Sequence, residues 1–183
     1  WLQHMVKSMN QRNGRCAVVL PQGVLFRGGK EGEIRKQLVL SDKLDCVISL
    51  VNNLFFGAGV SACILLLNNR KPENHKGKVC LIDGTGIYTP KRAKNILTEE
   101  DVETLFQLYA EYEDIQEKTR IVAIEEIQEK AFSLQVNNYI QREGPAAKSP
   151  ELVRQEFFAA LEAVFATEDQ LYELLVKGRY VHE

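Results

Sequence analysis

The sequence is poor in the residues from which metal sites and disulfides are built. It has four cysteines and three histidines in 183 residues, and none stands at the short CxxC or HxxxH spacing of a zinc site. Each cysteine lies inside an apolar run, which indicates buried free thiols in a reducing compartment. We therefore expect a cytoplasmic protein without a bound metal.

Long apolar stretches and obvious catalytic partners are missing as well. No apolar run approaches the roughly 18 residues that cross a bilayer, and no basic-then-apolar segment opens the chain, so neither a membrane span nor a signal peptide is predicted. His4, His75 and His182 have no obvious Ser, Cys or Asp partner, which argues against a hydrolase triad. The chain starts at Trp1 rather than Met, as expected of a fragment.

One glycine motif fails as a cofactor fingerprint. Gly84-Thr85-Gly86 follows a predicted strand, but Thr89 takes the place of the third glycine and Pro90 stands where a helix should begin. We expect a plain turn there.

What the chain does have is a strong division of charge. Residues 1–95 carry 15 Lys and Arg against 6 Asp and Glu, whereas residues 96–183 carry 8 against 19. The resulting charges of +9 and −11 sum to the −2 of the whole chain. A basic half indicates contact with a polyanion, although attraction between the two halves is an alternative that charge alone leaves open.

Apolar spacing predicts an α/β first part. We expect helices at residues 1–9 and 31–40, and strands at 16–20, 45–51, 61–67 and 79–83. A strand, a helix and a second strand in succession predict a mostly parallel sheet. The run at 16–20 is entirely apolar, so this strand should be buried on both faces.

The second part reads as helical. A capping box of Thr98 and Asp101 begins one helix, whose predicted buried stripe is Val102, Leu105, Phe106, Tyr109 and Tyr112. A short strand at 120–124, a small helix at 125–130 and a linker at 144–148 follow. Ser149-Pro150 begins a last helical region that ends at Gly178. A second capping box is predicted at Thr167–Gln170. The region is therefore expected to be either a pair of helices or a single helical arm.

The segment LDCVISLVNNLFFGAGVSACILLLNN, residues 44–69, is the most informative one. Two apolar strands meet at a loop in which Phe55 and Phe56 precede Gly57-Ala58-Gly59. Such a loop can place a flat ring at the mouth of the sheet, where a nucleobase stacks. Ordinary packing of these rings in the core is the alternative.

Basic residues gather in three loops of the first half. Pairs occur at Arg27 and Lys30, at Arg70 and Lys71, and at Lys91 and Arg92. Clusters of this kind fit contacts with DNA phosphates, whereas solvated loops are the equally weighted alternative.

A longer string carries a family resemblance. NGRCAVVLPQGVLFRGGKEGEIRKQLVLSDKLDCVISLVNNLFFGAGVSACILLLNN resembles the later part of the catalytic domain of adenine-specific DNA methyltransferases, above all the modification subunit of type I restriction-modification systems. GKVCLIDGTGIY, NILTEEDVETLFQLYAEYED and AFSLQVNNYI resemble the continuation of that family. The resemblance covers about residues 1–142.

The resemblance implies an α/β fold: a partial Rossmann-like methyltransferase sheet, with its later strands and terminal hairpin, followed by a helical C-terminal region. It divides the chain into a part of the catalytic domain at 1–95, a helical continuation at 96–143, and a linker and helical arm at 144–183. It implies methyl transfer from S-adenosylmethionine to the exocyclic amine of adenine in duplex DNA. Phe55 falls on the aromatic that stacks on the extruded base, with Phe56 as the second choice.

The chain departs from the family in what it lacks. The catalytic Asn/Asp-Pro-Pro-Tyr/Phe motif is absent, since the sequence has no Pro-Pro pair. The glycine-containing segment that holds the cofactor is missing as well, and both would lie upstream of Trp1. Relatives often carry proline near Val51-Asn52. No catalytic or cofactor-binding residue is therefore assigned, and the isolated segment is expected to be inactive.

The resemblance also implies partners. They are duplex DNA, a specificity subunit, for which the helix after Ser149 is a candidate docking element, and the restriction subunit of the same system. A non-catalytic DNA- or protein-interaction module derived from this fold is the alternative, and an unrelated nucleotide-binding α/β enzyme is a weaker third interpretation.

Overall fold

The computed structural model describes residues 1–55, 59–92, 94–141 and 149–180. They fall into two compact units, Trp1–Arg142 and Glu143–Glu183. The strands are β1 (Arg15–Pro21), β2 (Leu44–Leu50), β3 (Ala62–Asn68), β4 (Lys78–Gly84), β5 (Thr89–Pro90), β6 (Asn95–Ile96) and β7 (Thr119–Ala123). The α-helices are α1 (Leu2–Ser8), α2 (Gly29–Leu40), α3 (Glu99–Glu111), α4 (Ile124–Glu129) and α5 (Pro150–Lys177), and 3-10 turns lie at Gln22–Leu25, Glu73–His75 and Val136–Asn138.

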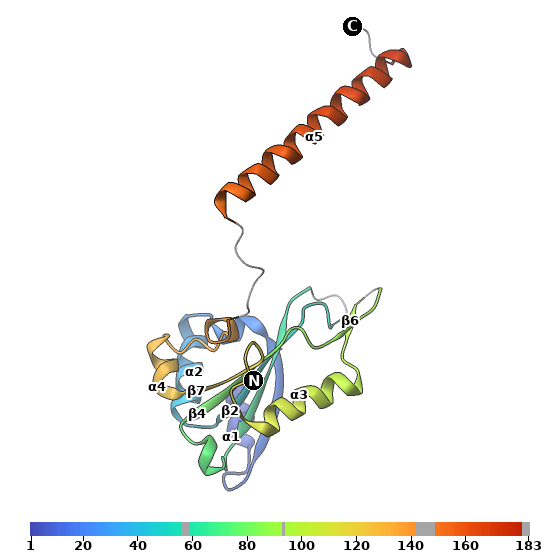
Figure 1. Cartoon of the computed structure of the whole chain (residues 1–183). Coiled ribbons are helices and arrows are strands. Elements are labelled where there is room, and N and C mark those ends of the chain that lie inside the picture. Colours follow the sequence, from blue (N-terminus) through green and yellow to red (C-terminus); the bar gives the residue numbers. More distant parts are fainter. Residues whose placement is uncertain (56–58, 93, 142–148, 181–183) are drawn as a thin grey trace. The chain divides into compact units, whose positions relative to one another are not determined.

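The first unit is built on a mixed five-stranded sheet with the order β1-β3-β2-β4-β7 (Figure 1). Only the pair β2 and β4 is parallel, among the strands that the structure describes, and the other three pairs are antiparallel. The prediction of a mostly parallel sheet is therefore wrong. The reason is that β3 returns directly beside β2 instead of crossing over, and β7 returns beside β4.

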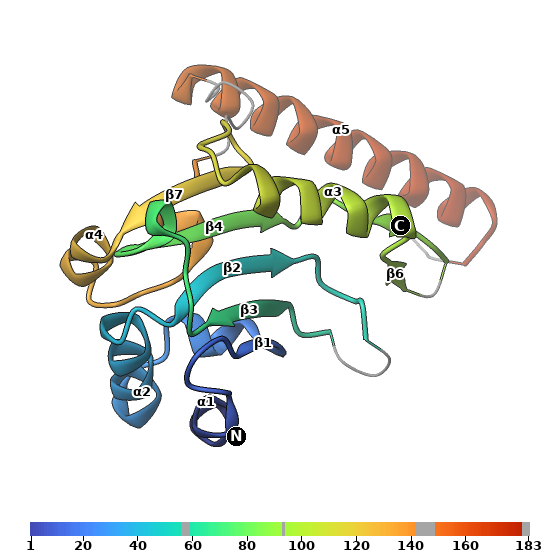
Figure 2. The same cartoon turned by 90° about the horizontal axis from the view of Figure 1, so that it is seen from below.

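Helices cover both faces of this sheet (Figure 2). Leu105, Leu108 and Tyr112 of α3 pack against one face, whereas α2 and α4 contribute Leu38, Val39 and Ile127 to the other. Because β2 lies in the middle, all seven of its residues are buried. Residues after 95 thus complete the same core as those before it, through α3 and β7.

The predicted elements of the first unit are confirmed to within two residues at their ends, but the burial of β1 is not. Its residues alternate between exposed and half-buried, and the side chain of Val19 is 51% exposed. β1 is an edge strand in the described sheet. Its Cys16, Val18 and Leu20 pack against the cluster of α2 and α4, but no β1 residue joins the cluster under α3, so the other face of this strand lacks the cover that an all-apolar run predicts.

The buried stripe of α3 is also narrower than predicted. The capping box is present, since the Thr98 side chain accepts from the Asp101 amide and the Asp101 side chain accepts from the Thr98 amide. Leu105 and Leu108 are buried, but Val102 and Phe106 are 54% and 59% exposed. The helix lies on the sheet along one line of residues, which turns the side that carries Phe106 toward solvent.

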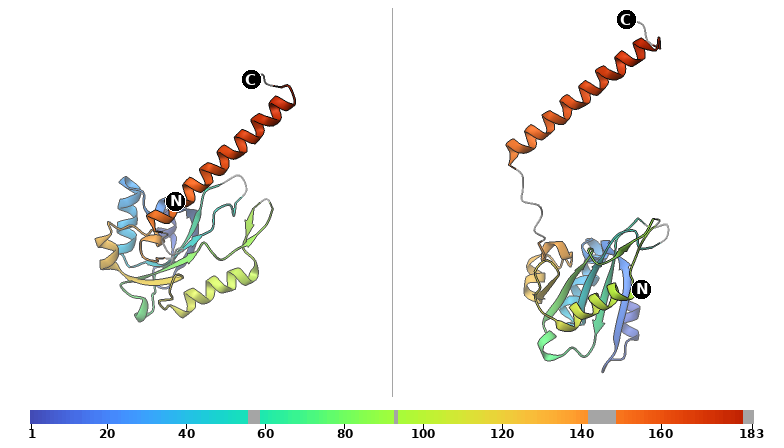
Figure 3. Two further views of the ribbon diagram at one scale, coloured as in Figure 1. Left: turned by 45° about the horizontal axis from the view of Figure 1, so that its top comes forward. Right: turned by 45° about the vertical axis from the view of Figure 1, so that its right-hand side comes forward.

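In its described residues, 149–180, the second unit contains one uninterrupted helix, α5 (Figure 3). Ser149 caps it by accepting from the Leu152 amide, and Pro150 is its first residue, as predicted. The second capping box is wrong, because the Thr167 hydroxyl donates to the Ala163 carbonyl at 2.8 Å within the helix. The C-terminal region is an arm and not a helical pair. The predicted linker at 144–148 lies outside the described residues.

No described helix combines the length and the apolar character that a membrane crossing requires.

Candidate functional site

The carboxyl ends of β2 and β4 lie at one edge of the sheet, which we call the carboxyl edge. The register pairs Ser49 with Asp83 and Leu50 with Gly84, so the two parallel strands end side by side. β3 begins at the same edge, because Ala62 and Cys63 lie across from the ends of β1 and β2. Ligands of α/β sheets commonly bind at this end of parallel strands.

The loop that follows β2 presents an aromatic ring at this edge. Asn53 adopts the left-handed conformation, with a φ of 58°, and the chain then reaches Phe55. The Phe55 side chain is 47% exposed, so it is not part of the hydrophobic core. Phe56 lies outside the described residues. About half of this residue is therefore accessible to solvent.

The small hairpin β5–β6 lies directly against this loop. The Asn95 amide donates to the Asn53 carbonyl at 3.0 Å, and its side-chain amide donates to the Asn52 carbonyl at 2.9 Å. At the turn of the hairpin, Lys91 and Arg92 are exposed. The structure thus brings one predicted basic pair next to the Phe55 loop. This neighbourhood was not predicted, because Asn52 and Asn95 are 43 positions apart in the sequence.

The hairpin is anchored on its other side by α3. The Thr89 hydroxyl donates to the Asp101 carboxylate at 3.3 Å, and that carboxylate also accepts from the Thr98 amide at 2.8 Å. These hydrogen bonds lower the pKa of Asp101, with the Thr98 backbone amide as the largest cause. The capping box of α3 therefore also fixes the basic hairpin.

The other predicted basic residues are dispersed. Arg27 and Lys30 are exposed at the start of α2, where the Arg27 guanidinium lies 3.8 Å from the Glu31 carboxylate. Arg70 and Lys71 follow β3 and lie at the opposite edge of the sheet from Phe55, since β3 begins at the carboxyl edge and runs away from it. One surface cannot hold all six residues together.

Lys71 has a structural role. Its ammonium group lies 2.7 Å from the Asp42 carboxylate and donates to the Lys78 carbonyl at 2.6 Å, with only 2% of the side chain exposed. Its assignment as a phosphate contact has no support in this geometry, because a phosphate would have to displace a buried ion pair.

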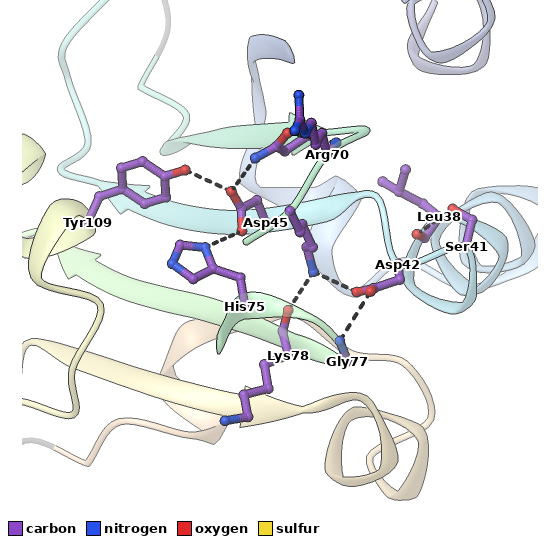
Figure 4. Close-up of polar contacts among 11 residues, drawn as sticks. Leu38, Ser41, Asp42, Asp45, Arg70, His75, Gly77, Lys78 and Tyr109 are labelled. Carbon is purple, nitrogen blue, oxygen red and sulfur yellow. Dashed lines mark hydrogen bonds and ion pairs between the residues drawn. The ribbon is translucent and has the colours of Figure 1, made fainter. Parts of the chain in front are cut away.

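Sequence reasoning missed a buried polar cluster around Asp45 (Figure 4). The Asp45 carboxylate is fully buried and lies 3.0 Å from the Nδ1 atom of His75. Its other oxygen accepts from the Tyr109 hydroxyl at 2.7 Å and from the Asn68 amide at 3.2 Å. The histidine without an obvious Asp partner in the sequence therefore has one, 30 residues away.

This polar cluster stabilises the fold. The His75 ring stacks on Tyr112 with centroids 3.4 Å apart, so the cluster ties α3 to the β3–β4 connection. Burial, followed by the hydrogen bond to Asp45, raises the pKa of Tyr109 above its ordinary range. The described residues form no hydrolase triad here, because none of the described side chains with a hydrogen bond or ring contact to Asp45 or His75 is a serine or cysteine.

The glycine motif has a packing role. A Cβ atom at Gly84 would lie 2.8 Å from the Ser49 carbonyl oxygen and 2.9 Å from a Leu105 methyl group. A turn follows, and then β5 instead of a helix, as the failed fingerprint predicted. The described residues also contain no group of three His, Cys, Asp or Glu side chains placed to hold a metal.

Comparison with known proteins gives these features a family. Residues 1–147 match the family described as N-6 DNA Methylase. The MjaVII methylase subunit of a type I restriction enzyme from Methanocaldococcus jannaschii is 34% identical over 143 residues, which are 76% of this chain and 24% of that protein.

Solved structures agree with this family match. The methyltransferase subunit of a type I restriction-modification system from Streptococcus thermophilus superposes with a TM-score of 0.71 at 34% identity, over 76% of this chain and 29% of that one. A chain from a structure of type I R-M complex assembly and conformational transition covers 96% of this chain and 39% of its own, with a TM-score of 0.60 at 22% identity, which is a likeness of fold.

The chain thus spans only about a quarter of the first of these relatives and less than a third of the second. Both are methylase subunits of type I systems, and the family match covers most of the present sequence. The chain belongs to the N-6 DNA methylase family.

Proposed function

We propose that this chain forms the target-base side of a site-specific DNA adenine methyltransferase. In the full-length subunit, a methyl group would pass from S-adenosylmethionine to the exocyclic amine of an adenine within a restriction-modification system. The half-exposed Phe55 at the carboxyl edge, in a chain of this family, is the observation that carries the proposal.

The role of Phe55 follows from the needs of the reaction. An enzyme that modifies a base must take it out of the duplex and hold its flat face. An aromatic partner contributes about 1–3 kcal/mol per stacked base. Phe55 is accessible and lies on a loop held by two hydrogen bonds from Asn95, so its ring can act as this partner.

The neighbouring hairpin supplies phosphate contacts in this proposal. Lys91 and Arg92 are exposed beside the Phe55 loop, where the backbone of an extruded nucleotide would lie. Arg27 and Lys30 are exposed as well and remain further candidates, each as one cation against one phosphate.

The described residues do not fit S-adenosylmethionine. Gly84 ends the parallel strand β4, its surroundings are filled by packing, and the chain continues into a turn and β5 instead of a helix N-terminus. We therefore place the cofactor and the catalytic Pro-Pro motif in another part of the full-length subunit, and expect the isolated segment to be inactive.

The helix α5 is the proposed docking element for the specificity subunit. Apolar or small residues recur along it at alternating spacings of four and three, as in a helix that packs lengthwise on another helix: Val153, Phe157, Ala160, Val164, Thr167, Leu171 and Leu174. All of them are exposed, and Phe157 and Leu174 reach 62% and 65%. The restriction subunit is the further candidate partner.

The stacking role can be tested in the full-length subunit with Phe55→Ala. Loss of about 1–3 kcal/mol of stacking should lower the rate of adenine methylation about 5- to 150-fold while cofactor affinity stays unchanged. A 2-aminopurine at the target position should show less fluorescence, because that probe brightens when it leaves the stack. Phe106→Ala removes another exposed ring, 59% exposed on α3, and serves as the matched control.

Normal methylation by Phe55→Ala would refute the stacking role. The alternative, a non-catalytic DNA- or protein-interaction module, predicts instead that the full-length wild-type protein transfers no methyl group from labelled S-adenosylmethionine to any duplex. The same assay therefore separates the two functions.

A further inference from the structure

A second group of cations lies at the edge of the sheet opposite Phe55, which we call the far edge. β1 begins there at Arg15, whose partner across the ladder is Asn68, the last residue of β3. Arg70 follows two positions later. Both arginines are exposed and so share one corner of the sheet, although 54 residues separate them.

The far edge is hollowed at this corner. A cleft of about 570 Å³ is lined by Asn13, Arg15, Arg70, Lys71, Pro72 and Glu73. A neighbouring cleft of about 430 Å³ shares Arg70 and Lys71 and adds Lys43. The two arginines thus point from different elements toward a concave surface.

The carboxylates around the cleft already have partners. Asp42 pairs with Lys71, and Glu73 pairs with Lys76. The buried Asp45 faces His75. By contrast, no ion pair joins Arg15 or Arg70 to a carboxylate within the part of the chain that the structure describes, so the cleft keeps an uncompensated positive charge.

We propose that this far-edge cleft, with Arg15 and Arg70 as its principal cations and Lys43 beside them, binds phosphates of the DNA backbone. Guanidinium groups suit this ligand, because their fork of N–H donors matches phosphate oxygens. The inference rests on the proposed function, but it assigns a separate contact. It adds Arg15 and Lys43 to the predicted Arg70 and replaces Lys71.

The geometry separates this contact from the base. β2 runs from the far edge to the carboxyl edge over seven residues, or roughly 20 Å at about 3.3 Å per residue. At about 3.4 Å per base pair, a duplex along the strands would reach the cleft roughly six base pairs from the extruded base. A short duplex centred on the target should therefore miss the cleft, and a longer one should reach it.

The test measures duplex binding by the full-length subunit together with its specificity subunit, because this assembly would hold the duplex at the target base. Fluorescence anisotropy with labelled duplexes of 10 and 24 base pairs, over a range of salt concentrations, compares the wild type with the double variant Arg15→Gln/Arg70→Gln. Each phosphate contact contributes about 0.9 to the slope of log K against log salt, so the slope for the long duplex should fall by about two. Affinity for that duplex should drop at least 10-fold, with little change for the short one.

Charge loss elsewhere provides the control. The double variant Arg154→Gln/Arg179→Gln removes two cations from the second unit and should leave the slope unchanged. Inorganic phosphate should compete with the long duplex only at far higher concentration, which identifies the backbone and not the free ion as the ligand. Polyglutamate of equal charge should compete poorly, whereas equal competition would point to an acidic protein partner and overturn the proposal.

Further outcomes would refute the far-edge site. An unchanged slope in Arg15→Gln/Arg70→Gln, an equal fall in the control, or an equal loss of affinity for the short duplex would each overturn the far-edge site. The proposed methyltransferase function fails separately, because in the full-length subunit the 2-aminopurine signal at saturating protein depends on Phe55 and should persist in the far-edge variant.

Discussion

The role of a single residue in this chain depends on its immediate contacts in the folded structure. Lys71 and Arg70 are adjacent in the sequence, yet one is buried against Asp42 and the other is exposed at a cleft. Gly84 is another case, since it stands where β2, β4 and α3 meet. At such positions a single added carbon has a measurable effect.

We expect Gly84→Ala to destabilise the fold by about 1–3 kcal/mol, because its Cβ atom would overlap the Ser49 carbonyl oxygen at 2.8 Å and Leu105 at 2.9 Å. Urea denaturation followed by circular dichroism measures the change. Gly86→Ala is the matched control, since nothing lies within 4 Å of its added Cβ atom and its φ is not in the left-handed region. Equal midpoints for both variants would contradict the packing role of Gly84.

Among the elements, α3 connects the basic hairpin β5–β6 with the buried polar cluster around Asp45. Its first turn holds the basic hairpin through Thr89 and Asp101, and its last turn reaches the buried cluster through Tyr109 and Tyr112. The capping box depends on an ionised Asp101. The pKa of this carboxyl lies below its ordinary value of 3.8 in the folded chain, chiefly because of the Thr98 amide.

This lowered pKa predicts a pH dependence. Because the folded pKa is below the unfolded one, the contribution of Asp101 to stability is fully present above about pH 4 and disappears as the pH falls through the folded value. Thermal unfolding should show Asp101→Asn melting below the wild type at pH 7, with the two curves converging in acid. Glu100→Gln removes a charge from the same turn but leaves the capping box, and should show no such convergence.

At the scale of the whole molecule, the chain separates into a sheet with its helices and an arm. Every residue of the two hydrophobic clusters lies between positions 2 and 140. The helix α5 has no buried residue and displays an apolar stripe. The first unit therefore has its own core, and α5 is the proposed docking element for a partner.

A chain that ends at Gln141 should keep a cooperative unfolding transition, because both clusters remain complete. In the full-length subunit, the same truncation should abolish copurification with the specificity subunit, if α5 is the docking element. Loss of cooperative unfolding would contradict the division into two units. Undiminished copurification would instead remove α5 from the proposed interface.

The sequence by itself determined what depends on near neighbours. Strand and helix positions, the Thr98 cap and the start of α5 at Pro150 follow from periodicity and from side chains within four residues of each other. The long ordered string also sufficed to indicate the family, which the comparison confirmed. For the Phe55 ring, the sequence is compatible both with exposure and with packing in the core.

Only the tertiary structure decided what depends on distant partners. The edge position of β1, the face of α3 that meets the sheet and the Asp45–His75 pair all arise from strand order and helix orientation, which local spacing does not encode. The same holds for the site. Hydrogen bonds from Asn95 bring Lys91 and Arg92 to Phe55, whereas the direction of β3 carries Arg70 to the other edge. Charge counted along the chain gives one basic half, but folding divides it between two surfaces.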